Sequence, residues 1–266
     1  MAEKKDSLKN IFFSHSGKIA DKWESYLDVY EEEFLRFRET QHPILEIGVQ
    51  NCGSLEVWAK YFSQSKAIIG VDILSKLRNL TFDDSRINLN ICDANNLHQD
   101  FLNNYQRPVI IIDDASHKSS DIIQTFMNMF PLLRDGGIYV AEDLCCAYWQ
   151  KFNKNVKKSS MTFFKMISDI VNFEHWEQEN TLKDYLKSMK IDLQQMLDIK
   201  TSIRSVKFYN SLCIVEKYKE NSFSGIGARV VMGKESPLGF KAENNQSIKE
   251  LKMKYRNFKF DDSDLS

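Results

Sequence analysis

Five short apolar segments, separated by stretches with helical patterns, constrain the fold of this chain more than any other feature of its sequence. The segments cover residues 43–48, 67–73, 87–91, 108–113 and 137–141. Helical patterns follow the first and the fourth of them, over residues 54–63 and 121–133. Apolar strands that alternate with helices are typical of a parallel sheet covered on both faces. We therefore predict an α/β fold.

The regions on either side of this alternation have other patterns. We predict an N-terminal helical extension over residues 1–40, with a helix over 18–40. Its apolar stripe consists of Trp23, Leu27, Tyr30, Phe34 and Phe37. The triplet 31–33 (Glu-Glu-Glu) is predicted to be the solvated face of this helix.

The predicted main domain covers residues 41–217. It contains a helical insert over about 144–200 and ends in a hairpin whose strands are residues 202–209 and 212–217. A loop-rich tail is predicted over residues 218–266.

Composition excludes several classes of protein. The net charge of −1 lacks the basic surplus of a nucleic-acid-binding protein. No apolar run approaches the ~20 residues that a membrane span needs. Five scattered cysteines form neither a disulfide framework nor a paired zinc pattern. We therefore expect a cytoplasmic protein that binds neither nucleic acid nor membrane, and homo-oligomerisation stays open.

A glycine-containing turn joins the first predicted strand to the first helix. It reads Glu-Ile-Gly-Val-Gln-Asn-Cys-Gly-Ser over residues 46–54. A dinucleotide fingerprint is excluded because position 50 is Gln, and a phosphate-binding loop is excluded because Ser54 and Leu55 follow Gly53. Either an adenosylmethionine-binding turn or a plain strand-to-helix connection remains.

Acidic residues follow the next two strands. Asp72 ends the second strand, where a carboxylate can accept hydrogen bonds from a ribose diol. Asp93 follows the third strand, where it could meet an adenine amino group. An acid at such a position can also be a simple helix cap.

Four carboxylates and a histidine follow the fourth and fifth strands. The fourth runs into Asp113, Asp114 and, three residues later, His117; the fifth runs into Glu142 and Asp143. Parallel strands place these ends at one edge of the sheet, where like charges repel each other unless a cation intervenes. Oxygen ligands favour a hard divalent ion. The alternative is that the acids cap a helix and that His117 is a surface residue.

These residues also carry a family resemblance. The segment 45–72, the DDASH motif at 113–117 and the ED pair at 142–143 resemble the macrocin and mycinamicin sugar O-methyltransferases. These enzymes are class I S-adenosylmethionine-dependent methyltransferases, close to the family labelled cephalosporin hydroxylase. The segments Asp21–Trp23 and Asp28–Tyr30 are similar to the same family. The resemblance implies a Rossmann-like, mostly parallel seven-stranded sheet with an antiparallel C-terminal hairpin.

The resemblance also implies a role for each candidate residue. Asp114, Glu142 and Asp143 would hold Mg²⁺ or Mn²⁺, and His117 would take the hydroxyl proton. The S-adenosylmethionine pocket would include Glu46, Gly48, Ser54, Asp72, Asp93 and Asp113. Cys52 departs from the glycine that relatives commonly have there.

The implied acceptor is a sugar hydroxyl. Its carrier would be a nucleotide, a glycan or a natural product. Four lysines beyond the Glu-Asp pair, at positions 151, 154, 157 and 158, would suit a nucleotide-linked sugar, although a solvated lysine face is the more common explanation of such a cluster. Two alternatives remain: a metal-independent methyltransferase and a non-catalytic adenosylmethionine-binding protein. A hydroxylase is disfavoured because no 2-His-1-carboxylate iron site is evident.

Overall fold

The computed structural model describes residues 6–97, 105–175 and 202–219, together with five single positions at 186, 187, 191, 196 and 199. The predicted tail from residue 220 onward lies outside the described residues. So does most of the predicted insert beyond residue 175.

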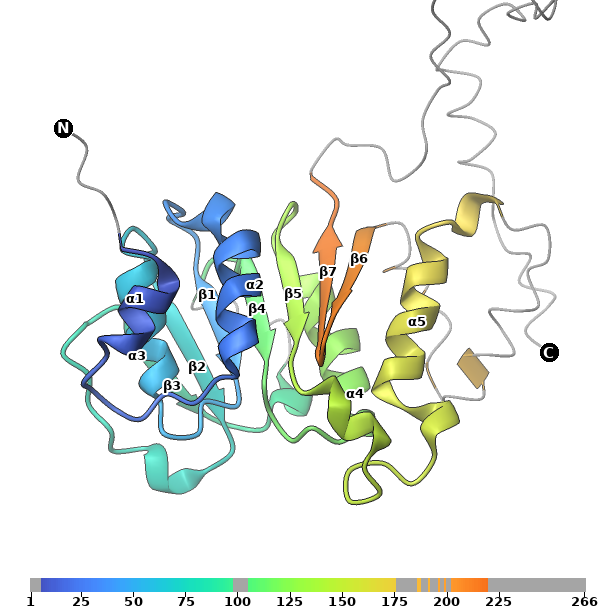
Figure 1. Ribbon diagram of the computed structural model, residues 1–266, viewed down its shortest axis with the longest axis horizontal. Helices are drawn as coiled ribbons and strands as arrows, with labels where there is room; N and C mark the ends of the chain where they lie inside the picture. Colours follow the sequence, from blue (N-terminus) through green and yellow to red (C-terminus); the bar gives the residue numbers. More distant parts are fainter. Residues whose placement is uncertain are drawn as a thin grey trace, which may run out of the picture.

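One seven-stranded sheet forms the centre of the molecule, in the order β3-β2-β1-β4-β5-β7-β6 (Figure 1). Strands β1 to β5 pair in parallel, and β7 runs antiparallel to both β5 and β6. The predicted α/β class and the C-terminal hairpin are thereby confirmed. The strands are β1 (Ile44–Ile47), β2 (Ile68–Asp72), β3 (Ile87–Ile91), β4 (Ile110–Asp113), β5 (Ile138–Ala141), β6 (Ile203–Tyr209) and β7 (Leu212–Lys217).

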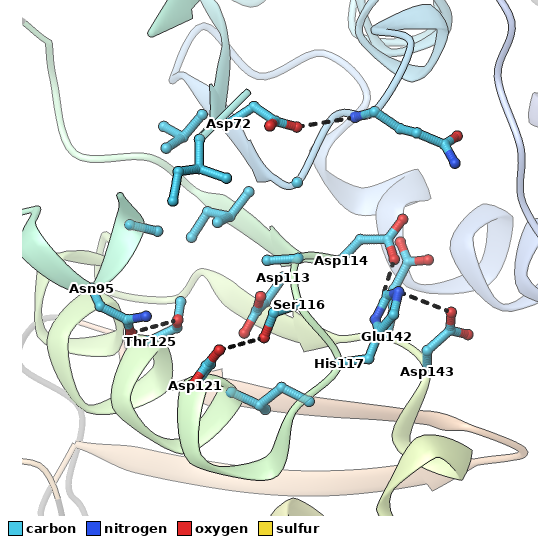
Figure 2. A pocket seen from close by; sticks show the side chains of 18 of the residues that line it. Asp72, Asn95, Asp113, Asp114, Ser116, His117, Asp121, Thr125, Glu142 and Asp143 are labelled. Atoms are coloured by element: carbon cyan, nitrogen blue, oxygen red, sulfur yellow. Dashed lines mark hydrogen bonds and ion pairs between the residues drawn. The ribbon is translucent and has the colours of Figure 1, made fainter. Parts of the chain in front are cut away.

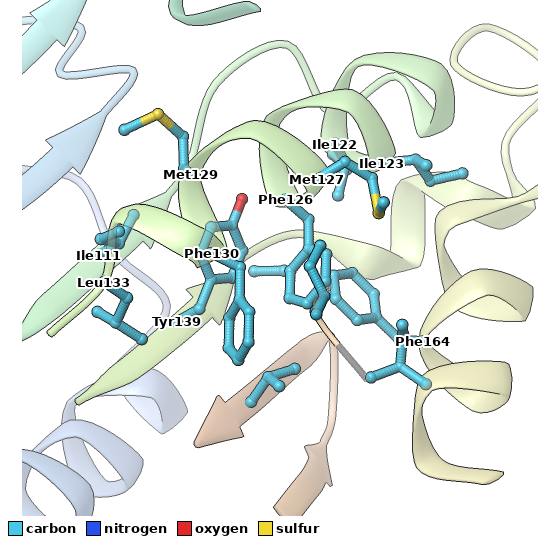
Figure 3. Close-up of a cluster of buried hydrophobic side chains, with 14 of the residues drawn as sticks. Ile111, Ile122, Ile123, Phe126, Met127, Met129, Phe130, Leu133, Tyr139 and Phe164 are labelled. Atoms are coloured by element: carbon cyan, nitrogen blue, oxygen red, sulfur yellow. The ribbon is translucent and has the colours of Figure 1, made fainter. Parts of the chain in front are cut away.

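Helices cover both faces of this sheet because neighbouring side chains of each buried strand point to opposite sides. In β1, Ile44 packs in the hydrophobic cluster with α1 (Leu8–Phe13), α2 (Glu24–Phe34) and α3 (Gly53–Tyr61). Its neighbour Leu45 packs in the other cluster, with α4 (Ser119–Met129) and α5 (Ser160–Ile170). Figure 3 shows the centre of this second cluster, where Phe126 stacks on Phe130 and meets the ring of Tyr139 edge-on.

Short 3₁₀ helices complete the described secondary structure. They cover Leu35–Phe37, Ser75–Leu77, Ala94–Asn96, Phe130–Leu132, Leu144–Tyr148, Val156–Lys158 and Phe173–His175. Within the described ranges, no helix is long and apolar enough to cross a membrane.

The N-terminal region differs from its prediction. The helix predicted from residue 18 begins only at Glu24, and the separate helix α1 precedes it. Residues 19–23 form no regular structure because this segment is packed against the start of α3. The N–H of Gly53 donates to the carbonyl of Ile19 at 3.3 Å, and a Cβ at Gly53 would lie 2.1 Å from the carbonyl oxygen of Lys18. Only glycine permits this approach.

Two side-chain predictions for the same region are wrong. Trp23, placed in the apolar stripe, lies before the helix and is 61% exposed. Glu33, placed on a solvated face, is buried and accepts hydrogen bonds from Lys207 at 2.7 Å and Tyr209 at 2.7 Å. The hairpin β6–β7 covers this side of α2, and charge pairing makes the burial of the carboxylate tolerable.

Candidate active site

A cavity of about 690 Å³ opens at the edge of the sheet where the parallel strands end (Figure 2). One part of its wall, here called the glycine end, contains Gly48, Gln50, Asp72, Asp93 and Asn95. The other part, here called the acidic end, contains Asp114, His117, Glu142 and Asp143. Asp113 also lines the cavity. The carboxyl ends of parallel strands are the usual ligand-binding edge of an open α/β sheet.

The turn after β1 follows an unusual backbone path. Gly48 has a φ of 83°, and a Cβ there would lie 2.3 Å from the carbonyl oxygen of Asp114, so no side chain fits. Gln50 and Cys52 also have positive φ, at 44° and 65°. Cys52 therefore keeps the left-handed conformation that glycine adopts most easily, and its side chain is buried.

Asp72 holds this turn in place. Its carboxylate accepts the backbone N–H groups of Val49 at 3.0 Å, Gln50 at 3.2 Å and Leu74 at 2.8 Å. The side chain is almost fully buried but still lines the cavity. Asp72 is thus a structural clamp as well as a candidate ligand-binding residue.

Asp93 caps the 3₁₀ helix that follows β3. Its side chain accepts the N–H of Asn95 at 2.9 Å, which is the capping role that the sequence left open. It also lines the cavity, as does the pair formed by Asn95 and Thr125, whose side chains are 3.2 Å apart. The sequence patterns gave no signal for Asn95 or Thr125.

Two predicted pocket residues, Glu46 and Ser54, lie behind the cavity wall and are not among its lining residues. Both are buried. The hydroxyl of Ser54 donates to Glu46 Oε2 at 2.6 Å, and Trp58 Nε1 donates to the same oxygen at 3.1 Å. Glu46 therefore fastens the first turns of α3 to the end of β1.

Asp113 ends β4 in a fully buried position. Its Oδ2 accepts the hydroxyl of Tyr139 at 2.8 Å. Burial raises the pKa of this carboxyl to about 7, against the opposing effect of the Tyr139 hydrogen bond.

Lys22 is the residue of the acidic end that sequence reasoning missed. Its side chain is 2% exposed. Its Nζ lies close to three carboxylate oxygens: Asp114 Oδ2 at 2.6 Å, Glu142 Oε1 at 2.8 Å and Glu46 Oε1 at 3.1 Å. Burial by itself lowers the pKa of this lysine, but the surrounding carboxylates raise it well above its ordinary value. Burial and the nearby Asp114 raise the pKa of Glu142 to about 8.

Helix α2 and the residue before it hold the Glu-Asp pair. Tyr30 donates its hydroxyl to Glu142 Oε1 at 2.5 Å. One turn earlier, Tyr26 donates to Asp143 Oδ1 at 2.9 Å, and Trp23 Nε1 donates to the same oxygen at 3.1 Å. The spacing of four residues puts both tyrosines on one face of the helix.

His117 lies between two of these carboxylates. Its Nδ1 is 4.0 Å from Asp114 Oδ1, and its Nε2 is 3.7 Å from Asp143 Oδ2 (Figure 2). The ring of Phe152 packs edge-on against it, with centroids 6.0 Å apart. His117 and Asp143 both have positive φ, at 57° and 51°. Such backbone conformations are uncommon outside glycine and cluster at functional sites.

The acidic end suits a hard divalent cation by the chemistry of its donors. Two groups bring their candidate ligand atoms within 4.8 Å of one another: Asp114 with His117 and Asp143, and Asp114 with Glu46 and Glu142. The second group surrounds the ammonium of Lys22. Carboxylate oxygens are the preferred ligands of Mg²⁺ and Mn²⁺. Of the predicted ligands, Asp114 belongs to both groups, Asp143 to the first and Glu142 to the second.

Comparison with known proteins gives a consistent set of relatives, although no family model matches the chain. A rhamnosyl tetracenomycin-C 2'-O-methyltransferase from Streptomyces olivaceus is 28% identical over 218 residues, covering 78% of this chain and 54% of the relative. The mycinamicin VI 2''-O-methyltransferase from Micromonospora griseorubida is 35% identical, covering 46% of this chain and 32% of the relative. The chain thus spans about half the length, or less, of these relatives.

A solved structure agrees with these relatives. The methyltransferase MycE of the mycinamycin pathway, in complex with Mg, SAH and mycinamycin VI, aligns with a TM-score of 0.61 at 25% identity. The alignment covers 83% of this chain and 57% of that one. The chain resembles the sugar O-methyltransferases. Its fold is the Rossmann-like fold of class I methyltransferases, as the sequence motifs predicted.

Proposed function

We propose that this protein is an S-adenosylmethionine-dependent O-methyltransferase that acts on a sugar hydroxyl with the help of Mg²⁺ or Mn²⁺. One observation carries the proposal. His117 lies within 4.0 Å of two carboxylates, Asp114 and Asp143, in the same cavity as a glycine turn and Asp72. The relatives are named as sugar O-methyltransferases, and the MycE structure contains Mg and SAH, which supports the same function.

The glycine end is the proposed site of S-adenosylmethionine, which supplies the methyl group. Gly48 lines this part of the cavity, and Asp72 offers a buried carboxylate to the ribose hydroxyls. Asp93 and Asn95 line the part of the wall proposed for the adenine ring. Glu46 and Ser54 act from behind the wall by fixing the turn.

The acidic end is the proposed site of chemistry. A bound divalent cation supplies positive charge that orients a sugar hydroxyl and lowers its pKa. Asp114, Glu142 and Asp143 are the residues proposed to hold it. His117 is the proposed general base, because its ring nitrogens face the space between Asp114 and Asp143 and can accept a proton from a hydroxyl placed there.

The proposed acceptor is a sugar with two neighbouring hydroxyls, since a hard cation held at the acidic end would favour an acceptor that offers two adjacent oxygen donors. Two groups of exposed side chains suggest different carriers for that sugar. The side chains of Lys151, Lys154, Lys157 and Lys158 are exposed and suit the diphosphate of a nucleotide sugar. Trp23, Tyr148 and Trp149 are more than half exposed and suit an apolar aglycone.

A panel of acceptors tests the proposal and separates the carriers. Methyl transfer from S-adenosylmethionine is measured with nucleotide sugars, free sugars, glycosides with apolar aglycones, and catechols. Turnover of any sugar class above the catechols supports the proposal, and the preferred class identifies the carrier. Turnover of catechols, with no turnover of any sugar, would refute the sugar assignment.

We also propose that this reaction takes place in the cytoplasm, where the free cysteines of the described region stay reduced.

A further inference from the structure

Three carboxylates surround the ammonium group of Lys22. Its Nζ donates hydrogen bonds to Asp114 Oδ2 and Glu142 Oε1, and Glu46 Oε1 lies 3.1 Å away as a third ion-pair partner. The side chain is enclosed, and the chain on both sides of it is anchored. Lys18 bonds to Glu56 through its N–H at 2.9 Å and its Nζ at 2.8 Å, and Trp23 bonds to Asp143.

The N-terminal segment donates hydrogen bonds to all three proposed metal ligands, and in each case to only one of the two carboxylate oxygens. Lys22 takes Asp114 Oδ2. Lys22 and Tyr30 share Glu142 Oε1, and Trp23 and Tyr26 share Asp143 Oδ1. The second oxygen of each carboxylate makes no hydrogen bond within the described part of the chain. For Asp114 and Asp143, that oxygen is the one that faces His117.

We propose that Lys22 is a positioning residue of the active site, a permanent internal cation that remains in place when a divalent cation binds beside it. It neutralises the inner carboxylates and fixes the orientation of Asp114 and Glu142, so that the second oxygen of Asp114 is presented together with His117 and the second oxygen of Asp143. The inference rests on the proposed function in one respect, namely that the acidic end takes a divalent cation.

The alternative is that the ammonium only fills the metal position and leaves when the metal arrives. The anchors argue against this. Moving Lys22 out would break its three ion pairs and pull on a segment that is bonded at Lys18 and at Ile19, where Gly53 allows close backbone contact. Four carboxylates around the single positive charge of Lys22 keep a net negative charge, which a divalent cation beside them would reduce.

Lysine footprinting tests this directly. The full chain is treated with an acylating reagent in chelator and in excess Mg²⁺, and modification of each lysine is read by mass spectrometry. Lys22 is expected to stay unmodified in both conditions, whereas the exposed Lys60 reacts in both. Modification of Lys22 in chelator would overturn the internal-cation assignment. Modification that appears only with Mg²⁺ would show displacement and also overturn it.

A variant series adds a readout that a purely structural lysine would not move. Lys22→Met should lower the unfolding midpoint in chelator by on the order of 5–10 °C, because three carboxylates lose their counter-charge. Mg²⁺ should then raise the unfolding midpoint of Lys22→Met by more than it raises that of the wild type. In the variant the metal ion is the only counter-charge left for the three carboxylates. Lys9→Met, whose partner Asp28 lies outside the cavity lining, is the matched control and should respond to Mg²⁺ like the wild type.

An equal Mg²⁺ response in Lys22→Met and the wild type would overturn the positioning role. If Lys22→Met does not fold, the footprint of the wild-type protein decides alone. Failure of methyl transfer with every sugar would refute the proposed function but would leave the footprint in chelator unchanged, so the two failures are distinguishable.

Discussion

The carboxylates at the two ends of the cavity differ in how far along the sequence their hydrogen-bond donors lie. At the glycine end, Asp72 and Asp93 bind backbone N–H groups that lie 2 to 23 residues away. At the acidic end, Asp114, Glu142 and Asp143 bind side chains that lie 92 to 120 residues away. The glycine end is therefore built by local turns. The carboxylates of the acidic end are held in their orientations by the N-terminal segment.

This difference suggests that the two ends can be disturbed separately. A change at the acidic end should affect chemistry and stability and leave cofactor affinity intact. A change at the glycine end should affect cofactor affinity more than it affects the chemical step.

The largest expected effect is at the acidic end. His117→Ala removes the proposed base and should slow the chemical step by on the order of 10²–10⁴-fold. Affinity for S-adenosylmethionine, measured by calorimetry, should stay within about twofold of the wild type. His42→Ala, outside the cavity lining, is the control and should retain activity. An equal loss of cofactor affinity would mean that His117 is structural and that the two ends are not separable.

At the glycine end, Asp72→Asn should weaken S-adenosylmethionine binding by on the order of 10- to 100-fold, because a charged acceptor is lost. Calorimetry measures the affinity, with the exposed Asp83→Asn as control. The structure adds a stability cost, since Asp72 also clamps the turn through Val49 and Gln50. Unchanged affinity in a folded Asp72→Asn protein would remove Asp72 from the cofactor site.

The dependence of the acidic end on α2 predicts a graded stability effect. Tyr30→Phe removes the donor to buried Glu142 and should lower the free energy of unfolding by about 1–3 kcal/mol. Tyr26→Phe, whose partner Asp143 is partly exposed, should cost less. Urea unfolding compares the two. A larger loss in Tyr26→Phe would contradict the view that Glu142 is the more deeply enclosed member of the pair.

The smallest expected effect concerns the backbone of the glycine end. Cys52 is left-handed, so Cys52→Gly should leave the protein about 1 kcal/mol more stable than Cys52→Ala. At Cys213, buried in the extended strand β7, the order should reverse. Thermal unfolding of the four variants measures both differences. The same order at both sites would show that the positive φ of Cys52 carries no strain.

The sequence predicts β1, β2, β4 and β5 well because each is a short apolar run that ends in, or is followed by, glycine or an acid. The same holds for Asp72, Asp93 and His117, whose positions follow from strand ends. Lys22 could not be found this way, because its role depends on contacts with residues about 92 and 120 positions away. The family resemblance of Asp21–Trp23 marked this segment but gave Lys22 no role, and periodicity alone does not distinguish such a lysine from a surface residue. For the same reason Glu33 was misplaced, since its burial depends on the distant hairpin β6–β7.

The dependence of the methyl-transfer rate on free Mg²⁺ decides whether the acidic end works through a divalent cation. The protein is stripped of metal with chelator, and the initial rate with a diol-containing sugar acceptor is measured as Mg²⁺ is restored. We expect no turnover in chelator, recovery with Mg²⁺ or Mn²⁺, and no recovery when Asp143 is replaced by Asn. Full activity after exhaustive chelation would contradict this expectation and would favour a metal-independent methyltransferase.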